Sequence, residues 1–265
     1  MIREELNSLP LYMFPGLKEF CGIRHFITCR EGGVSPEPYA SFNFGYSTGD
    51  ERDNVDRNID ILCKSLELER KQLFFPKQIH SSEVYRVSKD ELPKEVVSLD
   101  ALMTNEPGIC ICVKGADCVP VLFYDIRNHA VAVAHAGWKG TCSRIVQKVL
   151  TGMAREFGTR PSDIYAAIGP SIGPDAYVIG MDLYDRFNSE FLSFSDKILT
   201  VKSGNFHLNL WECNRQLLTE SGVPERNIEI AGICTYYNEH LFYSHRKSGG
   251  ITGRFAAGIL INPEN

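Results

Sequence analysis

Three residues of the types that bind transition metals stand in three separate segments of the chain. His80 lies in "KQIHSSEVYRV", Cys118 in "KGADCVPVLFYD" and His135 in "AVAVAHAGWKGT". Imidazole nitrogen and thiolate sulfur are ligands that zinc prefers, and a catalytic zinc keeps one position open for water or substrate. Since the ligands of a zinc finger are much closer in sequence, the long separations favour a catalytic site over a structural one.

Each of these residues also has a purely structural interpretation. His80 could be an exposed loop imidazole, Cys118 a thiol in the core, and His135 a strand-end histidine that bonds to a carbonyl. Cys110 and Cys112 compete as ligands, because residues two apart on a strand point the same way, although no second cysteine pair accompanies them. Residue types alone therefore leave the ligand set open.

Composition and charge narrow the class of protein. The chain has 265 residues with 43% hydrophobic composition, and its 28 Lys and Arg against 33 Asp and Glu give a net charge of −5. The sequence contains no basic block, so we do not expect a nucleic-acid partner. There is no apolar run long enough for a membrane span and no cleavable signal at the start, so we expect a cytoplasmic protein. The odd count of nine cysteines favours reduced thiols.

Apolar residues recur at helical spacing in three segments, which are 53–66, 141–157 and the segment between Asn209 and Gly222. Candidate capping residues flank these segments, namely Asp53 or Asn54, Gly158, Asn209 and Gly222. Each segment is therefore expected to form a helix.

Short β-rich runs predict the strands, which are 109–113, 119–124, 130–135, 164–169, 228–233 and 255–261. The first three are separated by "KGAD" and "DIRN", which we expect to be turns between central strands. Strands and helices do not alternate strictly. The pattern favours an α+β or layered α/β fold with helices covering sheets. Because no repeat or long linker divides the chain, a single domain over residues 1–265 is expected.

Six segments spread over nearly the whole chain form a specific set, which is "REGGVSPEPYASFNFGYSTGD", "QIHSSEV", "DALMTNEPGICICVKGADCVPVLFYD", "AVAVAHAGWKGT", "AIGPSIGPDAYVIG" and "CTYYNEHLFYSHRKSGGITGR". Their content and order resemble the YfiH family. That family is also called the polyphenol-oxidase, laccase-domain or peptidoglycan editing factor family, and it includes the mammalian protein FAMIN.

The resemblance implies a function and a metal site. Carried onto this sequence, the family's metal ligands fall on His80, Cys118 and His135, with zinc as the metal. The implied activity is phosphorolysis of purine nucleosides (adenosine, inosine, guanosine and methylthioadenosine), with adenosine deamination as a second activity. The implied fold has packed sheets flanked by helices.

Phosphorolysis requires a group that holds phosphate, and arginine recognises phosphate well because its guanidinium can donate two parallel hydrogen bonds. Arg30, Arg246 and Arg254 all lie in glycine-bearing loops, although each could equally be a solvated surface residue. Arg30 is our first candidate. The family's early segment resembles "TRRGGVS" there, and this chain departs from it with Cys29 and Glu31 on either side.

Four further residues are candidates for the site. Asp117, next to Cys118, could support the metal ligands or carry a proton, and equally it could cap a turn. Ser35, Asn43 and Gln78 could line a nucleoside pocket together with the loop "NEHLFYSHR", although serine and asparagine in loops are often turn formers.

Three other functions compete with phosphorolysis. A cysteine-based hydrolase acting on peptidoglycan precursors would use Cys118 as nucleophile and His80 or His135 as base. A copper polyphenol oxidase is disfavoured, because the seven histidines include no H-x-H pair. A binding protein with a structural zinc would need a fourth protein ligand, and none is obvious. The sequence does not predict the oligomeric state.

Overall fold

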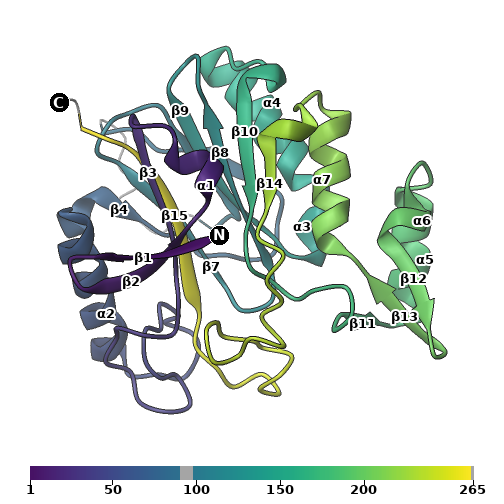
Figure 1. The fold of residues 1–265 in the computed structure, drawn as a ribbon, viewed down its shortest axis with the longest axis horizontal. Coiled ribbons are helices and arrows are strands. Elements are labelled where there is room, and N and C mark those ends of the chain that lie inside the picture. The colour runs from purple at the N-terminus through teal and green to yellow at the C-terminus, as the bar shows by residue number, and fades with distance from the viewer. Residues whose placement is uncertain (90–97, 264–265) are drawn as a thin grey trace.

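Two six-stranded sheets dominate the structure, a computed structural model that describes residues 1–89 and 98–263 (Figure 1). The first sheet contains, in spatial order, β1 (Ile2–Leu6), β2 (Leu9–Met13), β3 (Ile23–Thr28), β15 (Phe255–Ile261), β7 (Cys110–Gly115) and β4 (Leu73–Phe74). The second contains β14 (Ile228–Ile230), β10 (Ile164–Ile168), β8 (Val119–Asp125), β9 (Ala130–Ala136), β6 (Ala101–Thr104) and β5 (Val84–Arg86). Both are mixed, because β4 with β7, β10 with β14 and β5 with β6 pair in parallel while the other pairs are antiparallel.

A third, three-stranded sheet consists of β11 (Val178–Ile179), β13 (Asn205–Leu208) and β12 (Leu199–Lys202), and in Figure 1 it lies to one side of the two large sheets. The α-helices are α1 (Pro15–Lys18), α2 (Arg52–Leu66), α3 (Trp138–Cys142), α4 (Ile145–Phe157), α5 (Met181–Glu190), α6 (Ser195–Ile198) and α7 (Leu210–Glu220). Short 3-10 helices lie at Arg70–Gln72, Pro161–Asp163 and Glu225–Asn227. No helix among the described residues is long and apolar enough to cross a membrane.

The central strands are apolar on both faces because both faces are covered. On β15, Ala257 and Ile259 pack between the two large sheets, while Ala256 and Leu260 pack with the buried side of α2. This is why the run "FAAGILI" shows no alternation of polar and apolar residues. The result is four layers, with α2 outside the first sheet and α4 and α7 outside the second (Figure 1).

Strand β9 shows the same two-sided burial and sets the orientation of its last residues. Ala132 and Ala134 face the helical layer, whereas Val131 and Val133 face the other sheet. Because side chains alternate along a strand, His135 continues the row of Val131 and Val133. The imidazole therefore lies at the end of the layer between the sheets.

These observations confirm the expected fold of packed sheets flanked by helices. The single-domain organisation stays a prediction. The segment "KGAD" differs from expectation, because β7 and β8 belong to different sheets. It therefore passes from one sheet to the other, and Cys118 follows at the crossing. "DIRN" is the expected turn, since it joins the paired strands β8 and β9.

The helix predictions hold with two exceptions, an interior break and a wrong cap. The expected helix over 141–157 is split, because α3 ends at Cys142 and Arg144 adopts a left-handed backbone with φ 59° before α4 starts. The caps Asp53 and Asn54 were wrong, since α2 begins at Arg52 and no side chain caps it.

The other caps behave as expected. Asn209 accepts a hydrogen bond from the backbone of Glu212, and Gly158 takes the left-handed conformation after α4. Gly222, just beyond α7, is also left-handed with φ 95°.

Candidate metal centre

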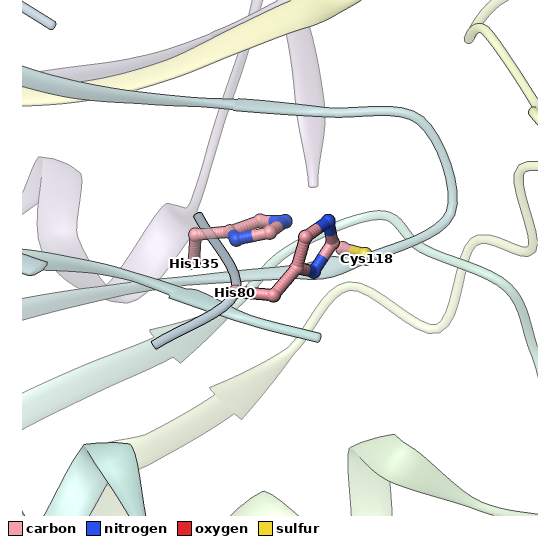
Figure 2. A group of neighbouring side chains, drawn as sticks. All are labelled: His80, Cys118 and His135. Carbon is pink, nitrogen blue, oxygen red and sulfur yellow. The ribbon is translucent and has the colours of Figure 1, made fainter. Parts of the chain in front are cut away.

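The side chains of His80, Cys118 and His135 converge at one end of the layer between the sheets (Figure 2). One ligand atom from each lies within 4.8 Å of the others, and the two imidazole centroids are 5.0 Å apart. The structure thus brings together the three residues that the sequence singled out. They come from the loop after β4, the crossing between the sheets and the end of β9.

Strand pairing explains why Cys118 meets His135. In the register of β8 and β9, Val119 lies opposite Ala136 and Pro120 lies opposite His135. Cys118 directly precedes β8 and, by alternation, shares a face with Pro120 and therefore with His135. The antiparallel pair thus aims both side chains at the same end of the inter-sheet layer.

Asp100, which the sequence analysis did not single out, organises the two histidines. This fully buried carboxylate lies 2.8 Å from His135 Nδ1 and accepts hydrogen bonds from the backbone N–H groups of His80 and Ser81, at 3.1 and 2.6 Å. Its backbone oxygen accepts from His135 N at 2.8 Å. Because Nδ1 of His135 is engaged, Nε2 is the nitrogen left for a metal, an arrangement common among metal-binding histidines.

Two residues of the site have backbones in the left-handed region, which residues other than glycine rarely adopt. His80 has φ 58° and Asp117 has φ 87°. The loop around His80 is held there by the Asp100 carboxylate, which also accepts from Ile79 N at 3.2 Å and Ser81 Oγ at 2.9 Å. Local strain sustained by surrounding contacts is typical of functional sites.

The donor groups perturb one another's protonation. Burial alone would lower the pKa of His135, but Cys118 and the Asp100 carboxylate raise it to about 9. Burial, followed by repulsion from His135, lowers the pKa of His80. Burial would raise the pKa of Asp100, yet its hydrogen bonds to His135 and Ser81 hold it below the usual range. These shifts follow from the close approach of the side chains, whose ligand atoms in His80, Cys118 and His135 lie within 4.8 Å of one another.

The donor set fits a metal with an open coordination position. Within residues 1–89 and 98–263, no fourth histidine, cysteine or carboxylate joins the group. A Cβ placed on Gly137 would lie 3.0 Å from Cys118 Sγ and 3.3 Å from His80 Nδ1. Glycine at this position therefore keeps the space beside the ligand atoms free. Two nitrogens and one sulfur suit zinc, and three protein ligands are typical of a catalytic rather than a structural site.

Asp117 serves as an anchor for the C-terminal loops. Its carboxylate accepts hydrogen bonds from Thr235 Oγ1 at 2.6 Å, Ser244 Oγ at 2.7 Å and the backbone N–H of Arg246 at 2.6 Å. Its backbone oxygen accepts from Ile172 N at 2.9 Å. Because three donors occupy the carboxylate, its contacts favour a supporting role beside Cys118 over that of a proton carrier.

The candidate arginines Arg30 and Arg246 are engaged with the protein itself. Arg30 donates to the carbonyls of Ala40 and Glu239, both at 2.9 Å, and its guanidinium covers the ring of Tyr243. Arg246 donates to the carbonyl of Val178 at 2.9 Å. Arg30 thus ties two loops together, and Arg246 ties its loop to β11.

Arg254 differs from the other two arginines because it lies near the cluster. Burial lowers its pKa, while the charges of Cys118 and Asp117 act in the opposite direction. Arg254 in turn contributes to the lowered pKa of His80.

The expected nucleoside-binding residues Ser35 and Asn43 face inward. They are 4% and 0% exposed, and both donate to Asp50, at 2.6 and 2.9 Å. Asn58 donates to Ser35 Oγ at 2.9 Å and to the backbone oxygen of Asn43 at the same distance. This network braces the loop between β3 and α2, and a role of Ser35 and Asn43 in nucleoside binding stays a prediction.

Gln78 binds the backbone of Lys114, a second residue that the sequence analysis missed. Gln78 Nε2 donates to Lys114 O at 2.7 Å, and Lys114 N donates to Gln78 Oε1 at 2.9 Å. The side-chain amide continues the pairing of β7 beyond the point where β4 ends. The available sequence signal was a lysine that interrupts the apolar run "ICICVKG".

The protein thus consists of two packed mixed sheets flanked by helices. Its cluster of metal-binding side chains lies at one end of the layer between the sheets. The chain belongs to the family described as multi-copper polyphenol oxidoreductase laccase, which matches residues 24–262. Together with the structural neighbours, this match confirms the resemblance to the YfiH family.

Relatives with known names or structures cover nearly the whole chain. A Bacteroides thetaiotaomicron protein named purine nucleoside phosphorylase is 38% identical over 257 residues, which are 94% of this chain and 95% of the relative. Purine nucleoside phosphorylase YlmD of Bacillus subtilis is 33% identical, over 88% of this chain and 86% of its own length. The crystal structure of Bacillus licheniformis hypothetical protein YfiH matches with a TM-score of 0.89 at 32% identity, covering 96% of both chains. The names of the two sequence relatives support an enzyme.

Proposed function

We propose that this protein is a zinc-dependent purine nucleoside phosphorylase. Its substrates in this proposal are adenosine, inosine, guanosine or methylthioadenosine together with inorganic phosphate. The observation that carries the proposal is the convergence of His80, Cys118 and His135 within 4.8 Å, in a chain 38% identical to a protein named purine nucleoside phosphorylase.

The reaction exchanges one bond of the nucleoside for another. An oxygen of hydrogen phosphate attacks the anomeric carbon, the bond from that carbon to N9 of the purine breaks, and its electron pair leaves with the base. The proton of hydrogen phosphate ends on the base, so the products are free purine and ribose-1-phosphate, or 5-methylthioribose-1-phosphate when methylthioadenosine is the substrate. The site must hold phosphate beside the sugar and keep water away, because water would give hydrolysis instead.

The residues of the chain supply a fixed setting for this reaction. His80, Cys118 and His135 would hold the zinc ion, which when bound supplies a Lewis acid beside the substrate. Asp100 fixes both histidines through the contacts described above, and Gly137 leaves room next to the ligand atoms. Burial of His135 at 4% exposure keeps one side of the site dry.

Adenosine deamination is the second activity that we assign to the same site. Water attacks C6 of the purine, ammonia leaves and inosine is formed. Because phosphate takes no part in this reaction, deamination should proceed equally with and without phosphate. The two activities are therefore separable in one experiment.

That experiment is a chromatographic assay of adenosine and of inosine, each with and without inorganic phosphate. The proposal expects free base and ribose-1-phosphate only when phosphate is present, and inosine from adenosine in both cases. Release of neither base nor inosine by protein that contains stoichiometric zinc would contradict it.

The contact between Cys118 and His135 favours one alternative, a cysteine hydrolase that edits peptidoglycan precursors. A histidine beside a thiol can take its proton and create a nucleophile. Metal analysis separates the two functions, because zinc bound to the Cys118 sulfur leaves no free thiolate. Copper oxidation is not part of the proposal, since the seven histidines include no H-x-H pair.

A further inference from the structure

Lys114, at the end of β7, is a partly buried cation without an anionic partner. Its ammonium lies over the ring of Phe75, 5.4 Å from the centroid. In the described part of the chain its ammonium donates no hydrogen bond, and no carboxylate lies within ion-pair distance. Burial, with a contribution from Arg254, lowers the pKa of Lys114 to about 8. Such a charge costs free energy unless an anion joins it.

Arg254 lies diagonally across the sheet from Lys114. Ala256 of β15 is directly opposite Lys114, and Arg254 precedes Ala256 by two residues. Residues two apart on an extended segment share a face, so the side chains of Arg254 and Lys114 are diagonal neighbours. Arg254 uses Nη1 to bind the carbonyls of Thr252 and Gly253, both at 2.8 Å. Among the described residues its Nε and Nη2 have no acceptor.

Two side-chain amides fix the backbones that carry these cations. Gln78 binds both backbone groups of Lys114, and Asn43 Oδ1 accepts from Arg254 N at 2.9 Å. A Cβ on Gly45 would lie 2.9 Å from Arg254 Cγ, so glycine there allows the loop to pack against the arginine stem. The two positions are thus held before any ligand arrives, which lowers the cost of binding one.

The same segments also carry the metal-binding cluster. Gln78 precedes His80 by two residues, and Lys114 precedes Cys118 by four. Arg254 is close enough to Cys118 for the thiolate to act on its pKa. Lys114 shares the α2-facing side of the first sheet with Ala256, so an anion held by Lys114 and Arg254 would lie on that side, at the end of the sheet where Arg254 is within electrostatic range of Cys118 and His80.

We infer that Lys114 and Arg254 form the site that holds inorganic phosphate for the reaction proposed above. Arginine offers a planar fork of donors and lysine a mobile point charge, which together suit a phosphate with its several oxygens. The inference rests on the proposed function for the choice of phosphate among small anions. Phosphate binding is therefore assigned to Lys114 and Arg254, which have donors available, and not to Arg30, which donates to two carbonyls.

Calorimetric titration of inorganic phosphate into the purified, metal-loaded protein tests the inference without relying on turnover. Lys114→Met and Arg254→Gln should each weaken phosphate binding about tenfold or more, whereas Lys114→Arg should largely retain it. Arg215→Gln is the matched control, because Arg215 is a partly buried arginine paired with Glu212 on α7. Arg30→Gln should leave phosphate affinity unchanged. Metal content and circular dichroism establish that each variant is folded. If Arg254→Gln does not fold, the phosphate affinity of Lys114→Met alone tests the inference.

Unchanged phosphate affinity in folded Lys114→Met, or no phosphate binding by the wild-type protein, would overturn the inference. Measuring the KM for phosphate in the release of base distinguishes a failure of the phosphate site from a failure of the proposed function. If base is released with the same phosphate KM in wild type and Lys114→Met, the phosphate site is wrong and the function stands. If phosphate binds in a Lys114-dependent way and no nucleoside is cleaved, the anion site stands and the function fails.

Discussion

Asp100 is the residue on which the alignment of the cluster most depends, because it contacts His135 directly and the backbone of His80 at the same time. A carboxylate in this position fixes the orientation of the imidazole and increases its basicity as a ligand. The consequence is that metal affinity should respond to a residue that does not itself bind the metal.

Asp100→Asn should lower zinc affinity about 10- to 100-fold, since the amide keeps the shape of the side chain and loses its charge. Competition with a chromophoric chelator measures this. Asp125→Asn is the control, because Asp125 is also buried and accepts from Arg127 N and Asn128 N in the turn after β8. It should lower stability and leave zinc affinity unchanged. Equal zinc affinity in Asp100→Asn and wild type would show that Asp100 is not a positioning residue.

Lys114→Met should make the protein more stable in phosphate-free buffer because it removes a charge whose pKa burial lowers to about 8. A shift of this size corresponds to about 3 kcal/mol, and we expect about 2 kcal/mol because the side chain is only partly buried. The cost of the charge is fully present below pH 8 and disappears as pH rises from about 8 towards 10.5. The gain should therefore shrink in that window, as urea unfolding at several pH values would reveal. A loss of stability at pH 7 would contradict our description of Lys114.

The junction between β9 and α3 combines a ligand, a glycine and a helix start within a few residues. Gly137 has an ordinary backbone with φ −65°, so alanine fits the backbone there and only the ligand atoms of Cys118 and His80 stand in its way. Gly158 is the opposite case, with a left-handed φ of 71° and no atom within 4 Å of a Cβ.

Gly137→Ala should therefore abolish or strongly weaken zinc binding with a small change in stability. Gly158→Ala should cost about 1 kcal/mol of stability and leave zinc binding intact, because only its backbone is strained. Metal analysis and thermal unfolding of both variants check the pair. Full zinc occupancy in Gly137→Ala would mean that the ligand atoms do not converge beside this glycine.

The elements near the site were predictable only where local signals act alone. The strand that carries His135 next to its last residue and the caps Asn209 and Gly158 follow from neighbouring residues, and the structure has them. The break between α3 and α4 was not predictable from apolar spacing, because Arg144 carries no glycine or proline signal and instead pairs with Glu190 and Glu220, distant in sequence.

In the molecule as a whole, the two sheets and their helices bury a large apolar core that does not include His80, Cys118 or His135. One buried polar group in this core responds to acid. His25 of β3 is 3% exposed and accepts a hydrogen bond from Phe14 N at 2.8 Å through Nε2, so it must be neutral in the folded protein. Burial lowers its pKa to about 4.

This histidine should make the fold sensitive to pH between 6.5 and 4. The unfolded chain binds a proton near pH 6.5 and the folded chain only near 4, so stability is full above pH 6.5 and falls by about 3 kcal/mol as pH drops to 4. His25→Gln, which keeps an acceptor for Phe14 N, should remove that part of the slope in urea unfolding. An identical pH slope in variant and wild type would contradict the assignment.

The candidate site was predictable in its ligands but not in what surrounds them. His80, Cys118 and His135 are chemically distinctive residue types, and the resemblance aligned them. Asp100 and Lys114 act through contacts with residues far away in sequence, such as His135 and Gln78, and these contacts exist only after the two sheets have packed.

If the bound metal is required for the chemistry, release of base must follow the zinc content of the protein, and a titration measures this dependence. Metal-free protein is titrated with zinc while the phosphate-dependent release of base from inosine is followed, and zinc bound per chain is measured in parallel. Activity should rise with zinc and reach its plateau at about one zinc per chain, with no rise in Cys118→Ser. Full release of base by protein shown to be free of metal, or a plateau that Cys118→Ser also reaches, would contradict it.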